Sequence, residues 1–179
     1  MWRFVIPIGL FAALATFLFV GLGRDKQTLP SPLIGKPAPL FELPRVDDPS
    51  QKISNREFAG QPYVVNIWGS WCVACREEHE ALLEIARRGE APLIGLNWKD
   101  ELPQAQRWLQ VLGNPYVVSA FDPEGNVGID WGAYGAPETF LVDARGIVIH
   151  KRVSPMTVDV WERDFLPLIK RSSAKAKGE

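Results

Sequence analysis

The chain has 179 residues, enough for one domain of ordinary size with a single hydrophobic core. Hydrophobic residues make up 46% and charged residues 23% of the chain, a balance that excludes a mainly disordered protein. With 20 basic and 21 acidic residues the net charge is −1, so the sequence lacks the basic excess of a dedicated nucleic-acid binder.

A run of uncharged residues lies near the start of the chain, from Phe4 to Gly23. At about 1.5 Å per residue, a helix of this length spans the ~30 Å hydrocarbon core of a bilayer. We expect residues 4–23 to form an uncleaved transmembrane anchor; a cleaved signal peptide and a buried core helix are the alternatives. The proline-containing segment 24–39 is expected to be a linker that holds the domain off the membrane.

The rest of the chain alternates between short β-branched or aromatic runs, which predict strands, and longer segments with helical apolar spacing. In chain order these are a strand at 63–68, a helix at 72–88, a strand at 93–96, a helix at 102–112, a strand at 116–120, a hairpin at 139–142 and 147–153, and a helix at 158–169. The alternation predicts an α/β fold with a mixed central β-sheet flanked by helices, covering residues 40–169. The polar residues 170–179 are expected to form a flexible tail.

The 2 cysteines of the chain, Cys72 and Cys75, lie where the first predicted strand passes into the first predicted helix. Free N–H groups and the helix dipole favour a thiolate at a helix N-terminus, and the thiolate is the nucleophilic form of cysteine. Cys75, one turn further along, is expected to be less exposed and placed to attack the sulfur of Cys72. The pair can open and close a disulfide with little backbone movement, which predicts redox activity.

Three other interpretations of the cysteine pair are weaker. A zinc site needs about four ligands, so His79 and His150 would have to join the cysteines, and His150 lies far along the chain on a strand-like segment. Haem attachment of the C-x-x-C-H type is excluded because residue 76 is Arg. A purely structural disulfide would close so short a loop that it would constrain the unfolded chain little. We therefore expect neither a metal nor a cofactor.

Four motifs are spread along the predicted domain: KPAPLF at 36–41, WCVACREEH at 71–79, LGNPY at 112–116 and YGAPET at 134–139. Together they resemble the DsbE/CcmG proteins of the thioredoxin superfamily, which are membrane-anchored periplasmic thiol:disulfide oxidoreductases of cytochrome c maturation. The resemblance extends from the anchor to about residue 169. It implies a thioredoxin-like fold in which Pro137 follows a cis bond, faces the cysteines and positions the substrate backbone; otherwise Pro137 is an ordinary proline at a strand entry.

By this resemblance, the protein is expected in the bacterial inner membrane as a single-pass protein, with its soluble domain on the periplasmic side. It would reduce disulfides of apocytochrome c, or of a cytochrome c maturation protein, before haem attachment. Cys72 would attack the substrate disulfide, and Cys75 would resolve the mixed disulfide. A membrane electron donor of the DsbD or CcdA type would then reduce the pair again.

Several residues around the cysteines are expected to support this chemistry. Asn66 stands where thioredoxin has a buried aspartate, so that proton acceptor for the second cysteine is missing. Glu78 and Glu138 match acidic residues of the DsbE/CcmG group and are expected to take over part of its role; otherwise both are solvated surface residues. Trp71 and Tyr134 are expected to flank the site unless they are core aromatics.

Two further functions remain open at the level of the sequence. One is a non-catalytic module that binds or holds apocytochrome, and the other is a dithiol oxidase with the same fold but a different reduction potential and partner. Many family members carry proline between the cysteines, whereas this chain has Val73 and Ala74, so the motif leaves the reduction potential open. A peroxidase is disfavoured because neither cysteine lies in a P-x-x-x-T-x-x-C context.

Overall fold

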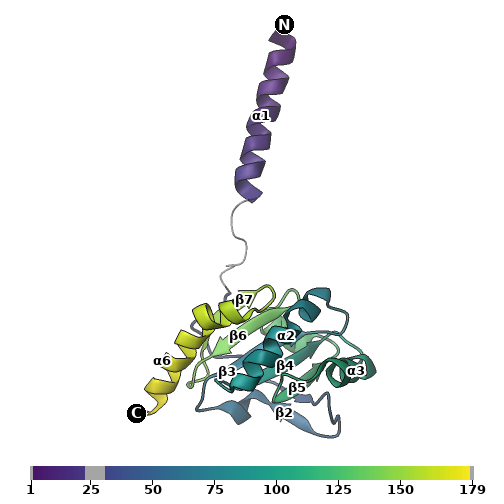
Figure 1. The fold of residues 1–179 in the computed structure, drawn as a ribbon, viewed down its shortest axis with the longest axis vertical. Coiled ribbons are helices and arrows are strands. Elements are labelled where there is room, and N and C mark those ends of the chain that lie inside the picture. Colours follow the sequence, from purple (N-terminus) through teal and green to yellow (C-terminus); the bar gives the residue numbers. More distant parts are fainter. Residues whose placement is uncertain (1, 23–30, 178–179) are drawn as a thin grey trace.

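The computed structural model describes residues 2–22 and 31–177 of the chain. A mixed sheet in the order β5-β4-β3-β6-β7 forms the centre of the domain, and a smaller sheet pairs β1 with β2 (Figure 1). The strands are β1 (Glu42–Pro44), β2 (Lys52–Ser54), β3 (Tyr63–Trp68), β4 (Leu93–Trp98), β5 (Val118–Asp122), β6 (Glu138–Val142) and β7 (Val148–Val153). The helices are α1 (Trp2–Leu22), α2 (Val73–Arg88), α3 (Leu102–Leu112), α4 (Asn126–Asp130), α5 (Val158–Val160) and α6 (Leu166–Lys177), with a 3₁₀ turn η1 (Asn55–Phe58) and a π-helical turn η2 (Trp161–Phe165).

The directions of the strands confirm the predicted mixed α/β sheet. β3 and β5 both run parallel to β4, because helical crossovers join these strands. β6 runs antiparallel to β3, and β7 pairs with β6 as the predicted hairpin. Helix α2 follows β3 after the short turn 69–72, so the cysteines lie at the carboxyl end of a central strand.

The side chains of β3 alternate between two core clusters, one on each face of the sheet. Val64 and Trp68 belong to the cluster beneath α2, α3 and α6, whereas Val65 and Ile67 belong to the cluster on the opposite face. Successive residues of a strand point to opposite faces, so Asn66 points to the face that α2 covers. Every side chain of β3 is buried, and a strand buried on both faces reads as an almost continuous apolar run.

The helix predicted at 72–88 is present, with Cys72 as its N-cap and Val73 as its first helical residue. It ends at Arg88, and Gly89 follows with φ 63°, in the left-handed region that glycine adopts without steric cost. Leu82 and Ile85 bury its apolar side in the core. This packing fixes the orientation of the helix whose first turn carries the cysteines.

The last helical segment is longer than predicted. It begins at Val158 as expected, but its final part, α6, ends at Lys177 instead of residue 169. Ser172 is buried, and its hydroxyl accepts a hydrogen bond from the N–H of Ala144 at 3.0 Å. This contact with the β6–β7 turn explains why polar residues expected in a flexible tail are helical. The third strand of the large sheet is also shifted, to Val118–Asp122 from the predicted 116–120.

Part of the predicted linker is bound to the domain. The N–H of Gly35 donates to the carbonyl of Val148 at 2.8 Å, and the N–H of Ala38 donates to the carbonyl of Gly146 at 2.8 Å. Ala38 is also buried in the core cluster away from α2. Residues 31–39 therefore lie along the β6–β7 hairpin and do not act as a spacer.

The anchor predicted at residues 4–23 coincides with α1 except for residue 23, which lies outside the described residues together with 24–30 of the predicted linker. In the described part of the chain, no helix is long and apolar enough to cross a membrane. The anchor therefore stays a prediction.

Candidate active site

Cys72 and Cys75 form a disulfide at the N-terminal end of α2, with their Cα atoms 5.2 Å apart. The Sγ of Cys72 caps the helix by accepting a hydrogen bond from the backbone N–H of Cys75 at 3.0 Å. In the reduced protein, this N–H and the helix dipole stabilise a thiolate on Cys72. The two residues are 4% and 3% exposed, so the expected difference in exposure is small in the oxidised form.

The loop in front of Cys72 is tied to the end of β4. The N–H and the hydroxyl of Ser70 both donate to the carboxylate of Asp100, each at 2.6 Å. The Nε1 of Trp71 donates to the carbonyl of Trp98 at 3.3 Å, while the residue stays 51% exposed. Trp71 therefore flanks the disulfide and is not a core aromatic. Asp100 was not predicted from the sequence, although an acidic residue two positions after a buried strand is a usable signal.

Glu78 is buried against Asn66 on the face of the sheet that α2 covers. Its Oε1 accepts a hydrogen bond from Asn66 Nδ2 at 2.9 Å, and its Oε2 accepts one from the N–H of Met156 at 2.6 Å. Asn66 Nδ2 also donates to the hydroxyl of Thr139 at 3.0 Å, and Asn66 Oδ1 accepts from the hydroxyl of Tyr116 at 2.7 Å. Because Glu78 is only 1% exposed, the alternative of a solvated surface residue is wrong for this position.

Burial raises the pKa of Glu78 to about 7, against 4.5 for an ordinary glutamate. The hydrogen bonds from Asn66 and Met156 and the charge of Arg152 favour the carboxylate, but desolvation outweighs them. Glu78 also follows Cys75 by three residues on the same helix, hence by about one turn. The site therefore holds a carboxyl group that can exchange a proton near neutral pH, one helical turn from the second cysteine.

The raised pKa of Glu78 makes stability depend on pH. Between pH 4.5 and about 7 the folded chain binds a proton that the unfolded chain has lost, so the free energy of unfolding falls as the pH rises through this range. From pH 5 to pH 8 we expect the wild type to lose about 2 kcal/mol more than Glu78→Gln does. The measurement is urea unfolding of the oxidised full-length chain in a non-ionic detergent at the two pH values.

Burial lowers the pKa of His79 and of His150, so both histidines contribute a pH dependence of the opposite sign. Both proteins retain these histidines, so their contributions cancel in the comparison. Equal pH dependence in the wild type and in Glu78→Gln would contradict the raised pKa of Glu78.

Glu138 lies on the opposite face of the sheet from Glu78. On β6 it precedes Thr139, which points to Asn66, so Glu138 points to the other side. Its Oε2 is 2.7 Å from the Nζ of Lys151, and both side chains are almost inaccessible, at 1% and 3% exposed. Its Oε1 accepts hydrogen bonds from the N–H groups of residues 134 and 135 at 3.1 and 3.2 Å. Glu138 is thus a buried ion-pair partner and not a solvated surface residue.

Glu138 and Lys151 together stabilise the loop that carries Pro137. The bond between Ala136 and Pro137 is cis, as the family resemblance implies. The Nζ of Lys151 donates to the carbonyl of Gly132 at 2.9 Å and lies 4.6 Å from the ring centroid of Tyr134. Tyr134 is 59% exposed, so it is not a core aromatic. Nothing in the sequence identifies Lys151 as a residue of the site, because a lysine in a strand normally faces solvent.

The two histidines considered for a zinc site are both held by other contacts. The Nδ1 of His79 accepts a hydrogen bond from the Nε1 of Trp108 at 3.3 Å, so its Nε2 carries the proton and donates to the carbonyl of Gly113 at 3.0 Å. His150 packs on Phe165, with ring centroids 4.8 Å apart. Within the described ranges, no three His, Cys, Asp or Glu side chains are grouped as metal ligands would be.

The fold and the cysteine pair together define the class of the protein. A thioredoxin-like sheet, with a C-x-x-C pair at the start of the helix after a central strand, is the framework of a thiol:disulfide oxidoreductase. The Redoxin family model matches residues 33–165. The chain is accordingly a thiol:disulfide oxidoreductase with a thioredoxin-like fold.

Curated relatives narrow the class to a family. The thiol:disulfide interchange protein DsbE of Allochromatium vinosum is 51% identical over 169 residues, covering 94% of this chain and 93% of the relative. The DsbE of Escherichia coli (strain K12) is 40% identical over 178 residues, covering 96% of each chain. A crystal structure of a DsbF homologue from Corynebacterium diphtheriae superposes with a TM-score of 0.67 at 21% identity, covering 83% of this chain and 94% of that one, which supports the fold. The chain belongs to the DsbE thiol:disulfide interchange proteins of the Redoxin family.

Proposed function

We propose that this chain reduces disulfides of apocytochrome c, or of a cytochrome c maturation protein, in the periplasm before haem is attached. The observation that carries the direction of electron flow is the buried carboxyl of Glu78, one helical turn from Cys75. Its negative charge disfavours a thiolate nearby, and a pair whose thiolates are less stabilised is a weaker oxidant. The family membership supports the same role, because the DsbE/CcmG proteins that the motifs resemble serve cytochrome c maturation.

In the proposed cycle the cysteine pair alone carries the electrons. The thiolate of Cys72 attacks one sulfur of the substrate disulfide, so a mixed disulfide forms and one substrate thiolate leaves. Cys75 then loses its proton and attacks Cys72, which releases the second substrate thiolate and closes the Cys72–Cys75 disulfide. Two electrons pass to the substrate, and its two thiolates take up protons. Glu78 is the proposed acceptor of the Cys75 proton, and Pro137 is proposed to position the substrate backbone.

Two further parts of the proposal concern the membrane. We propose that residues 4–23 anchor the chain in the bacterial inner membrane, with a single span and the domain on the periplasmic side. In support, this segment carries no charge, and the large side chains that the structure describes in it, among them Phe11 and Phe17, are exposed. Each cycle oxidises the cysteine pair, so a reductase in an oxidising compartment needs a dedicated donor. A membrane thiol donor of the DsbD or CcdA type would supply these electrons.

The test is complementation of a bacterial strain that lacks its own DsbE. We expect the full-length chain to restore covalent c-type cytochromes, measured by haem staining of membrane proteins. A variant with serine at both positions 72 and 75 is expected to restore none, although it reaches the membrane at the wild-type level. Full restoration by this double variant would contradict the proposal and indicate a module that only holds apocytochrome.

A second arm of the same experiment tests the reducing role. An added membrane-permeant thiol reductant should restore c-type cytochromes in the strain without any DsbE, because it replaces the electrons that this chain supplies. If an added oxidant restores them and the reductant does not, the chain is a dithiol oxidase.

A further inference from the structure

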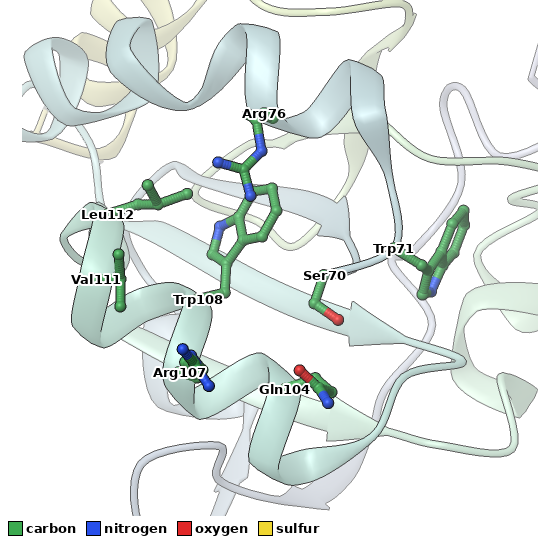
Figure 2. Close-up of a pocket in the computed structure, with 8 residues that line it drawn as sticks. All are labelled: Ser70, Trp71, Arg76, Gln104, Arg107, Trp108, Val111 and Leu112. Atoms are coloured by element: carbon green, nitrogen blue, oxygen red, sulfur yellow. The ribbon is translucent and has the colours of Figure 1, made fainter.

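An open cleft of about 280 Å³ lies between the first turn of α2 and the helix α3 (Figure 2). Ser70 and Trp71, directly ahead of Cys72, line it from the loop side, and Arg76, directly after Cys75, lines it from α2. A substrate chain that brings its disulfide to Cys72 therefore has this cleft within reach of its neighbouring residues.

The cleft is positively charged. Of its lining residues two are ionised, Arg76 from α2 and Arg107 from α3, and none is acidic. Neither arginine forms an ion pair with a residue that the structure describes, in contrast to Arg88, which pairs with Glu162 at 2.7 Å. Two unpaired guanidinium groups in one concave surface favour a carboxylate ligand and disfavour an ammonium group.

The guanidinium of Arg76 is held in place before any ligand binds. Its central carbon lies 4.7 Å from the ring centroid of Trp108, in a cation–π contact visible in Figure 2. Trp108 is itself fixed, because it is buried, donates to His79 and packs on Trp68 with ring centroids 6.3 Å apart. A stacked guanidinium loses little side-chain entropy on binding and keeps its N–H edges for a bidentate carboxylate.

Apolar side chains complete the surface on the side of α3. Val111 is 69% exposed, and Leu112 lines the cleft beside it. Together with Trp71 at the other end they offer hydrophobic contact along the same path as the two arginines. The surface therefore fits a short peptide segment with both an acidic and an apolar side chain.

We propose that this cleft binds the substrate segment next to the reactive disulfide and selects protein substrates with an Asp or Glu within a few residues of that disulfide. This inference rests on the proposed reductase function and names the substrate class of the same site. Arg76 and Arg107 are the specificity-determining residues, and a basic residue in the same place on the substrate is repelled.

The test uses three synthetic peptides, each with one intramolecular disulfide, that differ only in a flanking Glu, Gln or Lys. The reduced full-length chain in a non-ionic detergent is mixed with each peptide at low ionic strength, and the second-order rate constant of disulfide reduction is measured. We expect the Glu peptide to react about fivefold faster than the Lys peptide, as two exposed charge contacts allow. This ratio should approach one in high salt, which screens exposed charges.

Arg107→Glu leaves one positive and one negative charge in the cleft, so the ratio of the two rate constants should fall close to one. Arg107→Gln leaves Arg76 alone and should give an intermediate ratio. The measured quantity is the ratio of the rate constants for two peptides with the same protein. Any change in the intrinsic reactivity of the cysteines therefore cancels. Arg56→Glu is the matched control: it is the same charge change in η1, which contacts Tyr63 at the opposite end of β3 from the cysteines. It should keep the wild-type ratio.

The outcomes separate the inference from the function on which it rests. Equal rates for the three peptides with the wild type, or an equal ratio in Arg107→Glu and Arg56→Glu, would overturn the inference and leave the reductase function in place. If the wild type reduces none of the peptides, the reductase function itself is wrong and the inference is overturned with it.

Discussion

Cys72→Ser is expected to lower disulfide reduction to the background rate of the buffer, because the one thiol that remains, Cys75, is assigned as the resolving group and does not hold the N-cap position that favours a nucleophilic thiolate. Cys75→Ser is expected to behave differently. It keeps the attacking sulfur but lacks the resolving one, so it should accumulate a mixed disulfide between Cys72 and the substrate. Both results are read from thiol release with a disulfide peptide and from non-reducing gels.

The comparison of the two serine variants provides its own control. Each loses one sulfur and the same disulfide, so any loss of stability is shared, and only the order of attack distinguishes them. Circular dichroism and the unfolding midpoint show that both are folded. Full activity of Cys72→Ser, or trapped substrate in Cys72→Ser and none in Cys75→Ser, would contradict the assignment of Cys72 as the nucleophile.

Lys151→Met is expected to reduce the free energy of unfolding by about 3–5 kcal/mol, because it leaves the carboxylate of Glu138 buried without its counter-charge. The same change removes the hydrogen bond to Gly132 and the cation above Tyr134. The loop that carries Pro137 therefore loses several anchors at once. Urea unfolding of the oxidised full-length chain at neutral pH measures the effect.

Two further variants show whether the loss of stability in Lys151→Met comes from the buried charge of Glu138. In Lys151→Met combined with Glu138→Gln no ion is left unpaired, so the double variant should be more stable than Lys151→Met alone. Lys52→Met removes the exposed pair with Glu42 and should leave stability almost unchanged. A Lys151→Met protein as stable as Lys52→Met would contradict the role of the buried pair.

Much of the fold follows from sequence patterns that are long enough to be distinctive. The predicted bounds of β3 and α3 coincide with the observed ones, because a buried apolar run and an amphipathic helix each carry a clear period. The strands β1 and β2 were missed because each has 3 residues, too few for any period to show. The packing of residues 31–39 against the β6–β7 hairpin was also missed. It depends on backbone hydrogen bonds, and no pattern of proline and glycine in the sequence predicts these.

Most residues of the candidate site could be predicted from the sequence, but their arrangement in space could not. Local sequence identifies the cysteine pair, and the motif resemblance points to Pro137 and to both glutamates. The separation of the glutamates on opposite faces depends on the register that pairs Asn66 with Thr139, and this register joins segments far apart in the chain. The sequence therefore assigned one shared role to Glu78 and Glu138. The structure instead places a carboxyl of raised pKa near Cys75 and an ion pair beneath the Pro137 loop.

The proposed reducing role is tested most directly by the reduction potential of the cysteine pair. The full-length chain in a non-ionic detergent is equilibrated with thiol–disulfide buffers, and the fraction of the Cys72–Cys75 disulfide is followed at each ratio. We expect a potential in the reducing range, closer to about −270 mV, as in thioredoxin, than to about −120 mV, as in a strong oxidant. A potential near the oxidising end would contradict the reductase function and make the chain a disulfide-forming protein, with the fold and the cysteine pair unchanged.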